Sequence, residues 1–209
     1  MKKRIIFVDW YDVITKSDAW RYIQKNHPLY DFTQTLMNKL IIGSHPDEKD
    51  WMRGCKSTVE IVAKHCPGAT STSGMDIIAL EKEQYMNQLD HNIVLFDALR
   101  CFKSQGHLIV LATDNVDYFS ELISDFAEYD VFDYVINSAD VKALKAEDPE
   151  KFFGSFITSQ NMSFSDAILI DDKAYNIDAF TSVGGQGLCY KYPQDNVKQA
   201  MHELSLLLT

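Results

Sequence analysis

The sequence predicts an α/β fold in which a parallel, Rossmann-like sheet is interrupted by an inserted helical domain. Apolar, β-branched segments alternate with segments of helical periodicity along most of the chain, which is typical of a parallel sheet with helices on both faces. Strand-like segments are absent between residues 15 and 91, where only helical periodicity remains. With 209 residues and 46% hydrophobic content, the chain can form one core and a modest accessory domain.

Five segments are expected to be buried strands because they are short, apolar and followed by polar residues or glycine. In chain order they are 5–9, 108–113, 134–138, 167–171 and 187–190.

Helices are expected between the strands and within the insertion, where apolar residues recur every three or four positions. Those that cover the sheet are 92–104, 116–128 and 196–208. Those of the insertion lie near 18–25, 31–42, 48–65 and 75–89, with turn-rich loops at 43–46 and 67–74. The predicted domains are therefore an α/β core, residues 1–15 and 92–209, and a helical cap, residues 16–91, placed over the carboxyl end of the first strand.

The composition limits the possible partners. A formal net charge of −10 argues against a general nucleic-acid or anionic membrane surface. The apolar runs are too short to span a bilayer and no cleavage site follows the N-terminus, so a cytoplasmic protein is expected. A phosphorylated small molecule remains compatible with the negative charge, because a bound metal ion can invert the local field.

Chemically active side chains follow the predicted strands. Asp9, Thr113 and the pair Asp171 and Asp172 stand at strand ends, and Lys145 comes shortly after a fourth strand. Ligands bind outside the carboxyl ends of the strands in open α/β sheets, so these groups should meet in one small volume. Clustered carboxylates raise one another's pKa unless a cation joins them. Mg²⁺, which prefers oxygen ligands, is the expected occupant.

Four segments resemble the ordered motifs of the haloacid dehalogenase superfamily. Residues 6–15 (IFVDWYDVIT) resemble the first motif, a strand ending in a nucleophilic aspartate, and residues 108–115 (LIVLATDN) resemble the second. Residues 138–145 (SADVKALK) resemble the third, and residues 167–179 (AILIDDKAYNIDA) resemble the fourth. The stretch 51–57, WMRGCKS, is similar to the helical cap of the subfamily that places this domain between its first two motifs.

The resemblance implies a Mg²⁺-dependent, phosphatase-type hydrolase of a small phosphorylated metabolite, with an aspartyl-phosphate formed on Asp9. Thr113 would donate a hydrogen bond to the transferred group, and Lys145 would neutralise charge. The implied metal ligands are Asp9, the backbone carbonyl of Tyr11, Asp171 and Asp172. The residues expected to contact substrate are Tyr11, Asn115, Arg53 and Trp10.

Tyr11 departs from the phosphatase pattern, in which a second aspartate protonates the leaving group. Tyrosine at this position resembles 2-haloacid dehalogenases, which need no metal, whereas Asp171 and Asp172 resemble the metal-dependent enzymes. Dehalogenation is therefore the alternative reaction, and a catalytically weak or inactive ligand- or protein-binding chain is the alternative from another class. The role of Asp12 and the choice between monomer and homodimer stay open.

Overall fold

The structure is a computed structural model that describes residues 2–16, 23–88 and 90–208. A five-stranded sheet has the order β3-β2-β1-β4-β5, with all neighbouring strands parallel. The strands are β1 (Ile5–Val8), β2 (Leu108–Thr113), β3 (Tyr134–Asn137), β4 (Ala167–Asp171) and β5 (Gln186–Cys189). The predicted fold class is confirmed, and each strand end lies within one residue of its predicted position.

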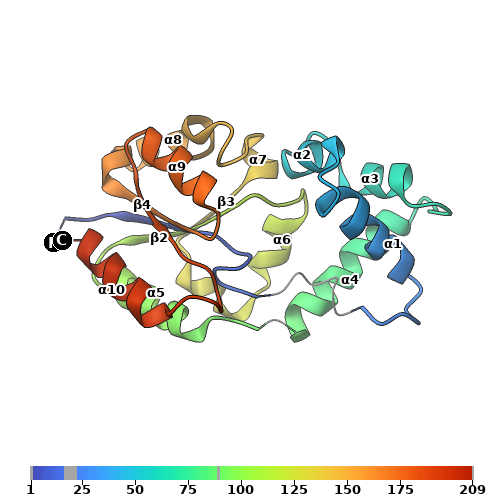
Figure 1. Ribbon diagram of the computed structural model, residues 1–209, viewed down its shortest axis with the longest axis horizontal. Coiled ribbons are helices and arrows are strands. Elements are labelled where there is room, and N and C mark those ends of the chain that lie inside the picture. The colour runs from blue at the N-terminus through green and yellow to red at the C-terminus, as the bar shows by residue number, and fades with distance from the viewer. Residues whose placement is uncertain (1, 17–22, 89, 209) are drawn as a thin grey trace.

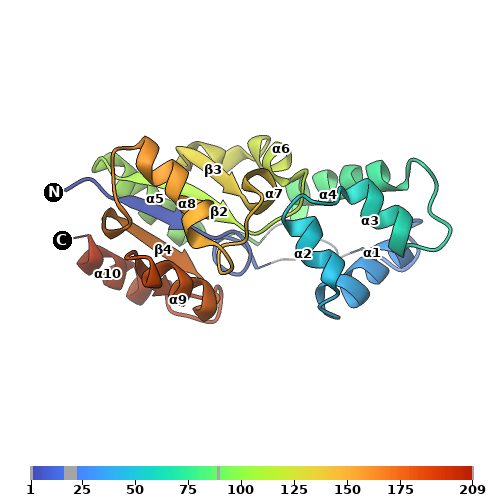
Figure 2. The same ribbon diagram turned by 90° about the horizontal axis from the view of Figure 1, so that it is seen from above.

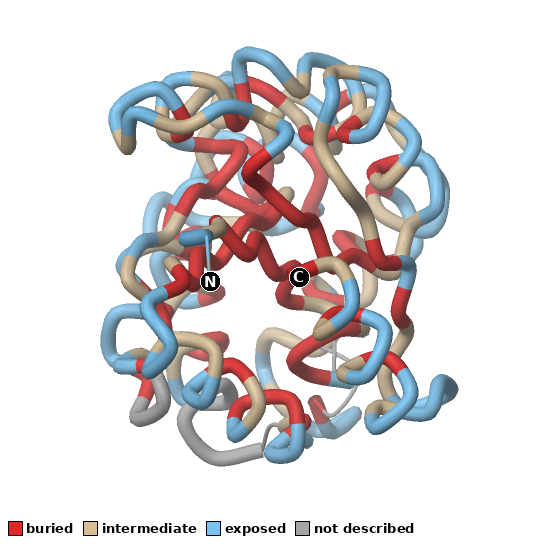
Figure 3. The backbone as a smooth tube through the Cα atoms, turned by 90° about the vertical axis from the view of Figure 1, so that its left-hand side faces the viewer, coloured by how far each residue is buried: buried red, intermediate tan, exposed pale blue. Residues whose placement is uncertain are grey.

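Helices cover both faces of the sheet (Figure 1). On one face, Ile6 and Val8 of β1 pack in a cluster with side chains of α5 (Ile93–Ser104), α6 (Phe119–Ser124) and α10 (Val197–Leu207). On the other face, Ile5 and Phe7 pack against α8 (Pro149–Ser159) and α9 (Ala174–Ser182). Successive side chains of a strand point to opposite faces, so a continuous apolar strand supplies both clusters. Figure 3 shows the buried residues concentrated along the central strands.

Short elements complete the α/β part. They are η3 (Ala127–Val131), α7 (Ser138–Val141) and η4 (Phe164–Asp166). The helix predicted over 116–128 is thus wrong in extent, because it forms only as α6 and is followed by the separate 3₁₀ turn η3. Asn115 Oδ1 accepts from the Val116 amide at 2.9 Å, which holds the entry to α6 in a turn rather than a helix.

The described residues 23–88, between β1 and α5, are mainly helical, as predicted. We call their elements the inserted helices: α1 (Tyr30–Thr35), the π-helix η2 (Leu36–Ile41), α2 (Pro46–Met52), α3 (Thr58–His65) and α4 (Ser73–Gln88). The helix predicted over 48–65 is two helices, because Ser57 forms a capping box with Glu60 and starts α3 anew. Residues 23–25 are not helical, and residues 18–22 of the helix predicted near 18–25 lie outside the described residues. Across the described residues, no helix is both long and apolar enough to cross a membrane.

The strands run toward the inserted helices, which lie beyond their carboxyl ends in both ribbon views (Figures 1 and 2). The end of α2 and the turn after it contact α7 and its C-cap residue: Ser138 Oγ donates to the Met52 carbonyl at 2.6 Å, and Lys142 Nζ donates to the Gly54 carbonyl at 2.7 Å. Gly54 has φ +61°, and a Cβ there would lie 2.4 Å from the Ala139 carbonyl oxygen. Glycine therefore permits both the backbone conformation and the close approach.

Candidate functional site

Asp9, Lys145 and Asp171 form a buried group at the carboxyl ends of the central strands. Lys145 Nζ lies 2.9 Å from Asp9 Oδ1 and 2.6 Å from Asp171 Oδ2, and its side chain is 1% exposed. Asp9 directly follows β1, where its amide donates to the Ile170 carbonyl at 2.9 Å, and Asp171 is the last residue of neighbouring β4. The pairing of β1 with β4 therefore brings the two carboxylates together, with one ammonium between them.

Burial and charge set the protonation of this group. Burial raises the pKa of Asp9 to about 7; attraction to Lys145 opposes this rise and repulsion from Asp171 adds to it. Burial would lower the pKa of Lys145, but the carboxylates of Asp9 and Asp171 outweigh it and hold that pKa well above its ordinary value. A second cation at the site would favour the ionised form of Asp9.

The Asp171 carboxylate is fixed by donors from the start of α9. Its Oδ1 accepts from the Lys173 backbone amide at 2.9 Å, and Asn176 Nδ2 lies 3.0 Å from each of its oxygens. Together with Lys145, these donors hold a fully buried carboxylate in one orientation.

Asp172 lies among two further ammonium groups. Its Oδ2 is 2.5 Å from Lys173 Nζ and 3.9 Å from Lys191 Nζ. Lys191 Nζ also lies 3.3 Å from Asp12 Oδ2. The Asp12 backbone has φ +58°, and this carboxylate pairs with Lys191 beyond the end of β5.

The acidic residues fit a hard divalent cation. Asp9, Asp171 and Asp172 each offer a carboxylate oxygen, and the three atoms lie within 4.8 Å of one another. Oxygen donors at this spacing suit Mg²⁺, which binds through a few carboxylates and keeps several waters. Tyr11, whose carbonyl the family resemblance implies as a further metal ligand, lies in the turn after β1 and forms a bridge with Thr15.

A second group with metal-ligand chemistry lies in the inserted helices. His45, Asp47 and His65 have ligand atoms within 4.8 Å of one another. Asp47, however, is already paired with Lys56 Nζ at 2.7 Å and Lys64 Nζ at 2.5 Å, and His65 Nε2 lies 2.7 Å from it. These contacts balance its charge and join α2 to α3, so this group has a structural explanation.

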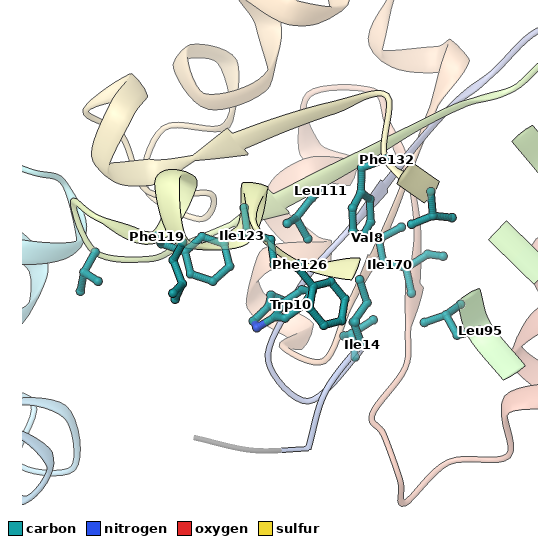
Figure 4. Packing of buried hydrophobic residues seen from close by; sticks show 14 of the residues in the cluster. Val8, Trp10, Ile14, Leu95, Leu111, Phe119, Ile123, Phe126, Phe132 and Ile170 are labelled. Atoms are coloured by element: carbon teal, nitrogen blue, oxygen red, sulfur yellow. The ribbon is translucent and has the colours of Figure 1, made fainter. Parts of the chain in front are cut away.

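Trp10, which the sequence predicts to contact substrate, lies within the apolar core. Its side chain is fully buried, and its ring lies 5.6 Å from Phe126 and 5.9 Å from Phe119, centroid to centroid. Figure 4 shows the indole inside the apolar cluster with Ile14 and Phe126. Trp10 follows Asp9 directly, and its side chain turns into the core on the α5 and α6 face, where burying a large aromatic surface is favourable.

The other expected substrate contacts have different surroundings. Asn115 is 4% exposed, and no partner for its Nδ2 is found in the described part of the chain. Arg53 is ion-paired with Glu147, which Lys49 also contacts at 2.7 Å. Tyr11 is half-buried and packs against the apolar cluster.

Thr113 is 1% exposed and is the last residue of β2, where it is paired with Asn137 of β3. Asp114, the next residue, accepts from the Lys145 backbone amide at 3.0 Å. This hydrogen bond joins the residue that follows β2 to the segment that carries Lys145, at the edge of the sheet where Asp9 lies.

The sequence did not identify Lys173 and Lys191 as part of the site. Lys173 is adjacent to the acidic pair, which was the available signal for it. The position of Lys191 follows only from the pairing of β4 with β5. Asp171 is opposite Cys189 in this pairing, which brings Lys191 near Asp172.

The raised pKa of Asp9 predicts that, without added metal, stability falls as pH rises. Between the unfolded value of 3.8 and the folded value of about 7, the native state binds more protons than the unfolded state. From pH 5 to pH 8, the free energy of unfolding should therefore fall by roughly 2 kcal/mol more in the wild type than in Asp9→Asn. Lys145 stays protonated in the folded and the unfolded state from pH 5 to pH 8, because its pKa is raised above its ordinary value. Its contribution to the free energy of unfolding therefore does not change over this range. Urea unfolding with EDTA measures the difference, and parallel pH profiles for the two proteins would contradict it.

Comparison with known proteins gives structural but not sequence matches. No family model matches the chain, and no curated protein matches its sequence. A HAD family enzyme from Bacteroides thetaiotaomicron, solved in complex with magnesium and inorganic phosphate, is 14% identical with a TM-score of 0.66, covering 95% of this chain and 99% of that one. A HAD phosphatase from Thermococcus onnurineus is 16% identical with a TM-score of 0.67, covering 98% and 97%.

A further structure, of a predicted HAD-like family hydrolase from Porphyromonas gingivalis, is 16% identical with a TM-score of 0.67. It covers 97% of this chain and 98% of its own. The likeness therefore extends over the inserted helices as well as the sheet. This chain has the fold of the haloacid dehalogenase superfamily, in agreement with its four sequence motifs.

Proposed function

We propose that this chain is a Mg²⁺-dependent, phosphatase-type hydrolase of a small phosphorylated molecule. The observation that carries the proposal is the buried group of Asp9, Lys145 and Asp171 at the carboxyl ends of β1 and β4. The similar HAD family enzyme solved with magnesium and phosphate supports both the metal and the class of substrate. The inserted helices would act as the cap that encloses the substrate.

Each residue of the site has a role in this proposal. An oxygen of the Asp9 carboxylate attacks phosphorus, the leaving group departs, and water then hydrolyses the aspartyl-phosphate. Lys145 holds Asp9 in place and balances negative charge during the transfer. Thr113 and the Nδ2 of Asn115, for which the described residues provide no partner, supply hydrogen bonds to the transferred group.

Asp9, Asp171 and Asp172, with the Tyr11 carbonyl, would hold Mg²⁺, which supplies positive charge for the phosphate oxygens. Asp171 enters this set already oriented by Lys145 and Asn176. The metal ligands therefore need little rearrangement of the backbone to accept a cation.

A hydrolysis screen tests the proposal. Phosphate esters, acyl phosphates and 2-haloacids are offered to the wild type with Mg²⁺ or with EDTA, and released phosphate and halide are measured. Phosphate release that requires Mg²⁺ is expected, with acyl phosphates preferred because their leaving groups need little protonation. Halide release in the presence of EDTA would instead establish the dehalogenase alternative, which Tyr11 favours. No turnover of any compound would favour a chain that only binds ligands.

Replacing Tyr11 by aspartate is expected to increase the hydrolysis of alkyl phosphates. The new carboxylic acid would stand two residues after Asp9 and could protonate the leaving alkoxide. A positioned acid contributes roughly 100- to 10,000-fold, so a gain of about 100-fold in kcat is expected, with a smaller gain on acyl phosphates. Tyr11→Asn, which has the same shape without the acid, is the control. An equal gain in the asparagine variant would show that general acid catalysis is not the cause.

A further inference from the structure

The acids of the candidate site are paired with ammonium groups of two kinds. Lys145 is 1% exposed and is enclosed between Asp9 and Asp171. The side chains of Lys173 and Lys191 are 44% and 41% exposed, and both approach Asp172. Lys145 therefore has no room to leave its partners, whereas Lys173 and Lys191 border on solvent.

Lys173 is held by its backbone amide and, separately, by the ion pair of its ammonium with Asp172. Its amide donates to Asp171 Oδ1 at 2.9 Å, which anchors the start of α9. Its Nζ lies 2.5 Å from Asp172 Oδ2, and the Asp172 side chain is only 2% exposed. Little water reaches this carboxylate, so the ammonium is the main charge that compensates it.

An ammonium and a divalent cation compete for such a carboxylate. A metal ion held by Asp9, Asp171 and Asp172 would stand within a few ångströms of Lys173 Nζ if the ammonium stayed in place. Like charges at that separation repel strongly where water is scarce. The half-exposed lysine side chain can instead swing into solvent, at the cost of its contact with Asp172.

We propose that Lys173 is an internal competitor of the metal: its ammonium holds Asp172 when no divalent cation is bound and must leave before one binds. Lys191 Nζ lies 3.9 Å from Asp172 and is paired with Asp12, so it competes with the metal for Asp172 more weakly. Metal affinity in this chain is therefore set by a residue that is not a metal ligand. This inference rests on the proposed function, because it concerns the same metal site.

Mg²⁺ binding to the purified chain tests the inference without any substrate. Isothermal titration calorimetry at constant ionic strength compares the wild type with Lys173→Met, Lys173→Arg and Lys191→Met. The dissociation constant for Mg²⁺ should fall about tenfold in Lys173→Met, a difference of about 1.4 kcal/mol, and less in Lys191→Met. Lys173→Arg, which keeps the charge, should bind Mg²⁺ as the wild type does.

Lys198→Met is the matched control, because it removes one exposed positive charge from α10 rather than from the site. Its dissociation constant should equal that of the wild type. The inference is overturned if Lys173→Met binds Mg²⁺ no more tightly than the wild type, if Lys173→Arg tightens binding as much as Lys173→Met, or if no variant binds. A chain that shows the expected affinities but hydrolyses no phosphate would refute the proposed function and leave this inference standing. Unfolding midpoints of all variants, measured with EDTA, establish that each one is folded.

Discussion

Asp9→Asn is expected to lose the proposed hydrolysis almost completely, by roughly four orders of magnitude or more in kcat. The amide cannot attack phosphorus, although it keeps an oxygen that can accept from Lys145. The measurement is phosphate release with Mg²⁺ under substrate saturation, together with mass spectrometry of acid-quenched protein to detect the aspartyl-phosphate.

Asp97→Asn is the control for this variant. It removes one carboxylate from the exposed face of α5, where Asp97 is paired only with Arg100 in the described structure. Activity in this control should be unchanged. If Asp9→Asn retains a tenth of the wild-type rate, another nucleophile must carry the reaction and the proposed mechanism fails.

Lys145→Met is expected to cause the largest loss of stability among these variants. Its ammonium lies between two buried carboxylates, and it also donates to the Ala112 carbonyl at 3.3 Å. Breaking a buried ion pair by removing one partner costs about 3 to 5 kcal/mol. For a chain of this size, the unfolding temperature should fall by about 10 °C.

Added Mg²⁺ should recover part of this loss, because a cation at the acidic group again compensates the carboxylates of Asp9 and Asp171. Thermal unfolding of the variant with EDTA and with Mg²⁺ measures both effects. Lys198→Met, again the exposed control, should unfold like the wild type. An unfolding temperature within 2 °C of the wild type for Lys145→Met would mean that the buried carboxylates are protonated rather than paired, on the scale of about 2–4 °C per kcal/mol.

The sequence predicted the sheet well because its strands are apolar on both faces and end in polar residues. The inserted helices were harder to delimit. The π-helix η2 continues α1 without any break in apolar periodicity, and the division between α2 and α3 depends on the capping box of Ser57 and Glu60 rather than on hydrophobicity. Local hydrogen bonds fixed these boundaries, and periodicity does not report them.

The central part of the site followed from topology. Asp9 and Asp171 were expected to meet because the carboxyl ends of parallel strands share one edge of a sheet, and they do meet, through Lys145. The direction of a side chain after the strand end was not predictable in the same way. The side chain of Trp10, next to Asp9, is buried in the core.

Contacts between distant segments could not be predicted from single motifs. Lys191 reaches Asp172 through the register of β4 and β5, and Arg53 meets Glu147 only because the turn after α2 approaches the loops of the sheet. Both pairs join residues that no local pattern connects.

Because Gly54 approaches Ala139 closely, the contact between the turn after α2 and α7 is sensitive to the size of the residue at position 54. A single methyl group at position 54 would occupy space that the Ala139 carbonyl and the Lys142 ammonium already fill, at 2.4 and 2.5 Å. Such a group would push the turn after α2 away from α7. The fit of the inserted helices against α7 therefore depends on the absence of a side chain at position 54.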